Sequence, residues 1–151
     1  MIDIHVGALE NRVGQEIGLS GWHEIRQATI DQFADATGDR QWIHVDPARA
    51  ASESPFHTTI AHGFLTLSLM SSLMRDAVRL EGTRMAINYG LNRVRFVSPV
   101  PSGSRVRGRF VLAAVEHVDN AVQATWKVTV ERDGSERPSC VAEWLVRYYP
   151  E

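Results

Sequence analysis

Asp39 and His44 are the residues of this chain whose types and spacing most directly suggest chemistry. They lie in the stretch T-G-D-R-Q-W-I-H-V-D-P, residues 37–47, which also holds Asp46. A carboxylate and an imidazole held side by side can accept and deliver protons near neutral pH. Because Gly38 is a helix-ending residue and the Asp-Pro pair at residues 46–47 is a helix-starting one, the stretch predicts an irregular segment between two helices. Such a segment can hold proton-transfer groups beside a substrate.

Two simpler interpretations of these residues remain open from spacing alone. An aspartate and a histidine five positions apart commonly make a surface hydrogen bond or belong to a turn. A metal site is the second alternative, with Asp39, His44, Asp46, His57 and His62 as conceivable ligands. We expect no metal, because no pair of histidines has the spacing that puts two ligands on one helix face. Asp46 is better explained as a helix cap.

Composition narrows the class of protein. At 151 residues, with 44% apolar and 23% charged residues, the chain fits one globular domain spanning residues 1–151. Its net charge of −2 argues against a nucleic-acid partner bound by broad phosphate neutralisation. Cys140 is the single cysteine, which excludes an intrachain disulfide and favours a reducing compartment. No stretch resembles a secretory signal or reaches the roughly 20 apolar residues of a membrane span, so we expect a cytoplasmic protein without a membrane partner.

Before the reactive stretch, the sequence predicts little regular structure and then one helix. Residues 1–21 carry several glycines and predict an irregular entry, and residues 22–28 fit a short strand. Thr29 and Gln32 have the spacing of a capping box, in which two side chains satisfy free amide groups at a helix start. A helix is therefore predicted from Thr29 to a stop at Gly38.

After the reactive stretch, Asp46 is expected to cap a short helix over residues 47–53, with Pro47 at its first position. The longest helix is predicted over residues 63–80, with Gly82 as its stop. Apolar residues cover most of its surface, which is typical of a helix wrapped by other structure. The remaining polar stripe consists of Ser68, Ser72, Arg75 and Arg79.

From Met85 onward, apolar and polar residues alternate in the pattern of strands. The clearest alternations cover residues 93–96, 105–112, 125–131 and 141–148, with an Asp-Gly turn signal at residues 133–134. Short helices, one long buried helix and then about four antiparallel strands predict an α+β fold. In that fold the sheet curls around the central helix.

Two blocks of the sequence resemble the MaoC-like (R)-specific enoyl-CoA hydratases, which have the hotdog fold. Their hydratase motif reads approximately G-D-x-N-P-[LIV]-H-x-D-P, and residues 38–47 read G-D-R-Q-W-I-H-V-D-P. Residues 60–65, I-A-H-G-F-L, resemble a second block at the start of the family's central helix. Gln41 and Trp42 replace the family's Asn-Pro, a form that resembles the branch containing nodulation protein N. We expect retained chemistry and an altered pocket shape, because a fixed backbone angle is lost and a bulky ring is added.

The resemblance implies a reaction and a set of site residues. Water adds to a trans-2-enoyl thioester or leaves a 3-hydroxyacyl thioester, so the substrate carries coenzyme A or pantetheine and no further cofactor is expected. Asp39 is implied as the base that activates water, and His44 as the group that orients it. The amide of Gly63 is implied as the donor to the thioester oxygen, with a packing glycine as the alternative. Further oxyanion or substrate-binding candidates are Ser71, Gln41, His62 and Phe64, of which Ser71 and His62 also fit structural roles.

The resemblance also implies a homodimer, because a single hotdog sheet exposes an edge that a second copy can cover. Two other functions stay open: a hotdog acyl-CoA thioesterase, and a non-catalytic acyl-thioester-binding subunit of a larger dehydratase complex. The presence of both Asp39 and His44 argues against the second. Arg105, Arg107 and Arg109 share one strand face, which is most simply solvated. The alternative is that they join Arg93 and Arg95 in binding the phosphates of coenzyme A.

Overall fold

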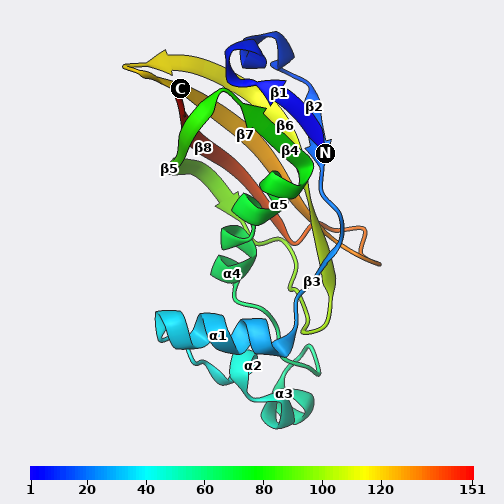
Figure 1. Cartoon of the computed structure of the whole chain (residues 1–151). Coiled ribbons are helices and arrows are strands. Elements are labelled where there is room, and N and C mark those ends of the chain that lie inside the picture. Colours follow the sequence, from blue (N-terminus) through cyan, green and yellow to red (C-terminus); the bar gives the residue numbers. More distant parts are fainter.

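An antiparallel sheet curves around two consecutive helices in the computed structural model of the chain, which describes residues 1–151 (Figure 1). This arrangement confirms the predicted α+β fold with a sheet around a central helical element. The alternating strands of the second half are longer than the sequence pattern indicated. In spatial order the strands are β2 (Glu16–Leu19), β6 (Arg105–Val118), β7 (Ala121–Arg132), β8 (Cys140–Pro150) and β5 (Thr83–Arg95), and β3 (His23–Glu24) also pairs with β6.

The central helical element consists of α4 (Gly63–Ser68) and α5 (Met70–Ala77), so the prediction of one helix over residues 63–80 was wrong at two places. Leu69 separates the helices, and the hydroxyl of Ser72 donates to its carbonyl oxygen at 3.0 Å. Serine bonds of this kind to the backbone often bend helices. None of the helices is both long and apolar enough to cross a membrane.

The helix ends at Ala77 because the next residues find a strand partner. β4 (Val78–Glu81) pairs in parallel with β1 (Ile2–His5), with Val78 opposite Ile2. A β-branched residue with a ladder partner favours the extended conformation over another helical turn. Arg79 therefore lies on a strand, outside the polar stripe predicted for the helix.

The N-terminal residues are more regular than expected. β1, a 3-10 helix η1 (Val6–Arg12) and β2 occupy most of the stretch predicted to be irregular, and β3 covers only two residues of the strand predicted over 22–28. Gly18 lies on β2, where the pairing with β6 shifts register, and it also allows close packing. A Cβ at Gly18 would lie 2.8 Å from Cγ2 of Val78.

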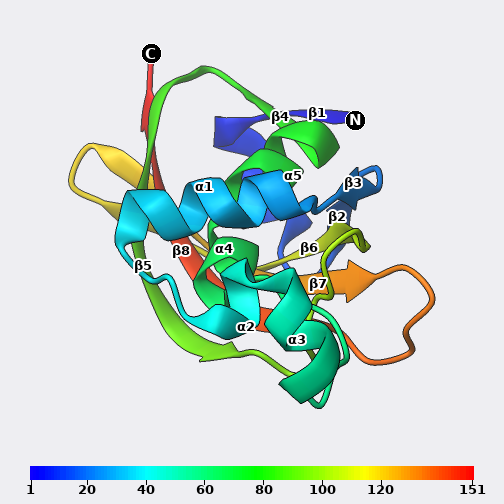
Figure 2. The same ribbon diagram turned by 90° about the horizontal axis from the view of Figure 1, so that it is seen from below.

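Three short helices form a lobe beyond one end of the sheet (Figure 1), and the view from below shows them in front of α4 (Figure 2). We call α1 (Gln27–Thr37), α2 (Trp42–Val45) and α3 (Pro47–Glu53) the helical lobe. The ends of its helices confirm two predictions. Gly38 ends α1 in the left-handed conformation at φ 78°, and the side chain of Asp46 caps α3 by accepting from the amide of Arg49 at 3.0 Å.

Two other predictions for the lobe were wrong. The capping box at Thr29 does not form, because α1 begins at Gln27, whose side chain bonds Asp31 one turn later and the distant Thr59. The segment expected to be irregular contains α2, a single helical turn that holds His44. In both cases contacts from outside the segment fix the backbone.

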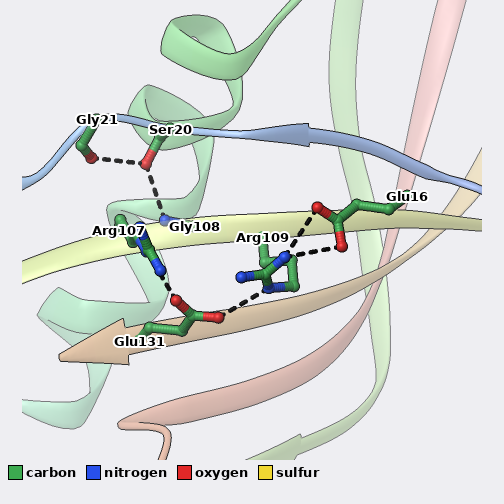
Figure 3. Close-up of polar contacts among 7 residues, drawn as sticks. All are labelled: Glu16, Ser20, Gly21, Arg107, Gly108, Arg109 and Glu131. Carbon is green, nitrogen blue, oxygen red and sulfur yellow. Dashed lines mark hydrogen bonds and ion pairs between the residues drawn. The ribbon is translucent and has the colours of Figure 1, made fainter. Parts of the chain in front are cut away.

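The arginine row of β6 is paired with carboxylates (Figure 3). Glu131 on β7 accepts from Arg107 at 2.7 Å and from Arg109 at 2.8 Å, and Arg109 also contacts Glu16 on β2 at 2.8 Å. Partial burial opposes ionisation of Glu131, but the bonds from Arg109 and Arg107 hold its pKa below the ordinary value. Arg105 pairs with Asp133. These arginines tie β2, β6 and β7 together and are not free cations for a ligand.

Gly108 lets the central helix approach the sheet. A Cβ at this position would lie 2.7 Å from the ring of the fully buried Phe110 and 3.1 Å from Cβ of Leu73 on α5. We predict that Gly108→Ala lowers the free energy of unfolding by about 1–3 kcal/mol, because the core has no room to accept the methyl group. Chemical denaturation measures this. Gly7→Ala is the control, with its nearest contact at an ordinary 3.4 Å; equal losses in the two variants would contradict the packing argument.

Candidate active site

His44 is a buried imidazole whose orientation is set by the backbone. It lies in α2 with 7% of its surface exposed, and its Nδ1 is 2.7 Å from the carbonyl oxygen of Ile60. Because a carbonyl only accepts, Nδ1 carries the hydrogen, and Nε2 is left as an acceptor in the neutral ring. Burial is the largest influence and lowers the pKa of His44 below its ordinary 6.5, against the opposing bond to Ile60. His62 lowers this pKa further, and Asp39 raises it.

His62 connects the two proposed reactive residues. Its ring stacks on that of His44, with centroids 3.9 Å apart and planes at 24°, and its Nε2 donates to the backbone carbonyl of Asp39 at 2.9 Å. The side chain is almost fully buried, and Phe33 packs on it at 4.9 Å. This backbone contact is the structural role weighed for His62 from the sequence. Because His62 is buried, its side chain is poorly placed for the substrate contact predicted from the sequence.

Asp39 lies on the exposed side of the same cluster. One of its carboxylate oxygens, one ring nitrogen of His44 and one of His62 lie within 4.8 Å of one another. A water molecule with hydrogen bonds of about 2.8 Å can link atoms up to about 5.6 Å apart, so the carboxylate and an imidazole can hold one water between them. The structure therefore brings Asp39 and His44 together, as the five-residue spacing suggested.

The same three groups fit a metal ion poorly. A metal bound by two imidazoles needs their nitrogen lone pairs to converge from directions well apart, as in tetrahedral zinc sites. The rings of His44 and His62 are stacked with only 24° between their planes, so their in-plane lone pairs cannot meet at one ion without rotation of a ring. Each ring is fixed against such rotation by its bond to a backbone carbonyl.

Gln27 and Thr59 are positioning residues that the sequence did not reveal. The side-chain amide of Gln27 donates to the carbonyl oxygen of His44 at 2.7 Å, and its oxygen accepts from the hydroxyl of Thr59 at 2.5 Å. They therefore hold the backbone of α2 at His44, in addition to the bond between the His44 ring and Ile60. The pairs lie 17 and 32 positions apart in the chain, and no local pattern links them.

Gln41 and Trp42, the departure from the family's motif, lie at the start of α2. The carbonyl of Gln41 accepts from the amide of His44 at 2.9 Å, while its own side chain is exposed. The guanidinium of Arg49 lies 4.4 Å from the centre of the Trp42 ring. Trp42 thus packs against α3 and lines none of the cavities of the chain, so the expected change of pocket shape is not seen at this ring.

Gly63 supplies the first amide of α4, and this amide makes no hydrogen bond within the chain. The glycine also has a packing reason, because a Cβ would lie 3.0 Å from the ring of Phe96. Phe96 in turn meets Phe64 edge to face at 6.0 Å. Phe64, a substrate-binding candidate from the sequence, is 68% exposed and lines no cavity of the single chain.

Ser71 lies at the junction of two adjoining cavities between the central helices and β5. The cavities have volumes of about 300 and 390 Å³ and share Ser71, Asn88 and Trp144. We call them together the groove. The apolar side chains of Leu67 and Met70 line it. The hydroxyl of Ser71 makes no hydrogen bond within the chain, so it is not the satisfied helix serine of the alternative interpretation, whereas Ser68 and Ser72 both bond backbone carbonyls.

The two halves of the candidate site are not enclosed together by one chain. Gly63 and Ser71 line cavities, but Asp39 and His44 line none of the four. The helical lobe carries the acid and the base beyond the end of the sheet (Figure 1), next to the start of α4. In the single chain Asp39 is thus exposed to solvent, while His44 is buried behind it.

Known proteins resemble this chain along almost its whole length. It is 54% identical over 144 residues to 3-hydroxyacyl-thioester dehydratase Z of Mycobacterium tuberculosis (strain ATCC 25618 / H37Rv), covering 95% of each chain. It is 50% identical over 147 residues to nodulation protein N of Rhizobium leguminosarum bv. viciae, covering 96% of this chain and 91% of that protein.

Solved structures share the fold. The R-hydratase PhaJ1 from Pseudomonas aeruginosa in its unliganded form matches with a TM-score of 0.70 at 25% identity, covering 92% of this chain and 83% of that chain. The (R)-hydratase from A. caviae involved in PHA biosynthesis matches with a TM-score of 0.70 at 25% identity, covering 91% and 96%. These likenesses confirm the hotdog fold expected from the sequence. Since residues 8–133 also match the MaoC like domain, the chain belongs to the MaoC-like family.

Proposed function

We propose that the chain catalyses the (R)-specific hydration of trans-2-enoyl-CoA to (R)-3-hydroxyacyl-CoA, or the reverse dehydration. The observation that carries the proposal is the cluster of Asp39 and His44 within 4.8 Å, beside the free first amide of α4. The relatives named as a 3-hydroxyacyl-thioester dehydratase and as R-hydratases support the same reaction. A single buried cysteine, Cys140, suits a reducing compartment such as the cytoplasm.

Asp39 and the neutral His44 are both acceptors, which defines how they hold water. Because Nδ1 of His44 donates to Ile60, only Nε2 can face the water, and it accepts. A water that donates one hydrogen to each residue keeps its oxygen lone pairs free to attack C3. One residue takes a proton as the C3–O bond forms, and the pair returns a proton to C2. Both residues end the cycle as they began.

The electrons of the double bond move toward the thioester oxygen during this attack, and a donor is needed there. The amide of Gly63 is the proposed donor, supported by its position at the start of α4 and its lack of another partner. The acyl thioester would lie from this amide along the groove, past Leu67 and Ser71. These steps use only groups of the protein, the water and the substrate.

The functional unit is proposed to be a homodimer joined along β5. This strand is an edge of the sheet, and both of its faces are exposed along most of its length. Met85, Ile87, Tyr89 and Leu91 are large apolar side chains, between 41% and 55% exposed. An exposed, apolar edge strand is a template for pairing with another chain.

Replacement of the proposed base tests the reaction. Asp39→Asn is expected to lower kcat for hydration by about 10²–10⁴-fold, because an amide cannot take the proton from water. Loss of enoyl absorbance of trans-2-enoyl-CoA substrates measures the rate, and chiral analysis of the product checks the R configuration. Asp3→Asn is a control that removes the same charge from β1, and its rate should equal that of the wild type. Equal rates for Asp39→Asn and the wild type at all chain lengths would refute the proposal.

The pH dependence tests the role of His44. Protonation of Nε2 removes its acceptor lone pair, so kcat/KM should fall as the pH drops through the pKa of His44, below 6.5. His62→Phe preserves an aromatic neighbour and removes the charge that lowers this pKa, so the acid limb should move to higher pH. Rate profiles and imidazole nitrogen chemical shifts measure the two midpoints. A midpoint above 6.5 in the wild type, or an unchanged midpoint in the variant, would contradict this account.

The dimer can be tested with one substitution on the proposed edge. Ile87→Asp should weaken self-association by orders of magnitude, because it places a charge in the apolar centre of the interface. Sedimentation equilibrium measures the dissociation constant. Val13→Asp alters an equally exposed apolar residue, 45% exposed against 44% for Ile87, on another surface. A monomeric wild type, or the same association constant in both variants, would exclude this interface.

A further inference from the structure

The far end of the groove carries two positive charges and no negative one. Arg75 on α5 and Arg84 on β5 both line its larger cavity, from opposite walls, and no aspartate or glutamate lines it. The floor between them is formed by Trp144, Val146 and Tyr148, which are buried. An apolar floor strengthens the attraction between cations and an anion, because it excludes water from one side.

Neither arginine is neutralised elsewhere in the chain. Arg75 and Arg84 make no salt bridge and no side-chain hydrogen bond, whereas each arginine of the β6 row pairs with a carboxylate (Figure 3 for Arg107 and Arg109). The hydroxyl of Thr83 lines the same cavity, and its oxygen is buried without a hydrogen-bond partner. Three donors without partners within the chain thus line the same cavity, in a chain whose net charge is −2.

The arginine end of the groove lies away from Gly63, the proposed donor to the thioester oxygen. Gly63, Leu67, Ser71 and Arg75 follow one another at intervals of four, which places them along one side of the central helices. At a rise of about 1.5 Å per residue, the two helices place Arg75 at most about 18 Å from Gly63 along the chain of turns, because Leu69 interrupts the axis between them. An anion at Arg75 would therefore belong to a part of the substrate remote from the reacting carbons.

We propose that Arg75, Arg84 and Thr83 form a binding site for an anionic group of the thioester substrate, remote from its double bond. This inference rests on the proposed function and names the substrate feature that the groove selects. Guanidinium groups bind phosphates and carboxylates alike through paired hydrogen bonds. The phosphates of coenzyme A and a carboxylate at the end of the acyl chain share this chemistry, and the ligands in the experiment distinguish them.

The experiment measures dissociation constants of saturated, unreactive thioesters by isothermal titration calorimetry. The three ligands are an acyl-CoA, the matching acyl-pantetheine without phosphates, and the acyl-pantetheine with a terminal carboxylate. They are titrated into the wild type, Arg75→Gln and Arg84→Gln. The control is Arg12→Gln, which removes an exposed arginine of η1 that is distant in sequence from Arg75 and Arg84. Because Arg75 and Arg84 are exposed, the variants should keep the fold, and circular dichroism checks this.

Each of Arg75→Gln and Arg84→Gln should weaken an anionic ligand about tenfold or more, and leave neutral acyl-pantetheine unchanged. If only acyl-CoA binds more weakly to the variants, the bound group is its phosphates. If only the carboxyacyl-pantetheine binds more weakly, the bound group is the carboxylate at the acyl end. The inference is overturned if neither anionic ligand responds, if Arg12→Gln has the same effect, or if only the dimer dissociation constant changes. In that last case the arginines would pair with a second copy.

The two proposals fail separately. Binding of saturated thioesters needs no reaction, so arginine-dependent binding without hydration of enoyl-CoA would exclude the proposed reaction and keep the anion site. Hydration that depends on Asp39, with binding indifferent to Arg75 and Arg84, would exclude the anion site and keep the reaction.

Discussion

The short segment Ile60–Ala61–His62 links the sheet to the helical lobe through hydrogen bonds. The amide of Ile60 donates to Ile43 in the lobe at 3.0 Å, and that of Ala61 donates to Val100 beside the sheet at 2.8 Å. The carbonyl of Ile60 receives Nδ1 of His44, and the side chain of His62 reaches back to the backbone of Asp39. Since α4 begins at the next residue, these bonds fix the acid, the base and the first helical amide relative to one another.

Burial and hydrogen bonding act together on the reactive imidazole. A buried histidine is costly to charge, and the stacked His62 adds to that cost, so His44 favours its neutral form. The bond to Ile60 then selects which nitrogen stays free, and Gln27 holds the backbone of the same turn. These contacts, and not the exposed Asp39 by itself, produce a pair of acceptors that can share one water. Positioning therefore depends on buried and partly buried residues outside the reactive pair.

The arginines of the chain fall into two groups with different physical consequences. On the neighbouring strands β6 and β7, Arg107 and Arg109 share Glu131 and are partly buried, so their charges serve to join β2, β6 and β7. Arg75 and Arg84 border a groove that no carboxylate lines. The arginine row of β6 thus has a structural role, whereas the proposed anion site combines arginines from α5 and β5, which no local sequence pattern links.

Local sequence signals alone were enough to predict several helix ends, the later strands and the reactive residues. Gly38 and the Asp46-Pro47 pair set helix ends because the left-handed conformation and the side-chain cap involve only neighbouring residues. Alternating residues determined the later strands, and the two motif blocks pointed to the family and to Asp39 and His44.

The tertiary structure decided what depends on distant partners. Pairing with β1 ended the central helix at Ala77, and contacts to His44 and Thr59 moved the start of α1 to Gln27. Stacking of His62 on His44 and the pairing of Arg107 with Glu131 were decided in the same way, because hydrogen bonds, stacking and ion pairs join residues that only the folded chain brings together.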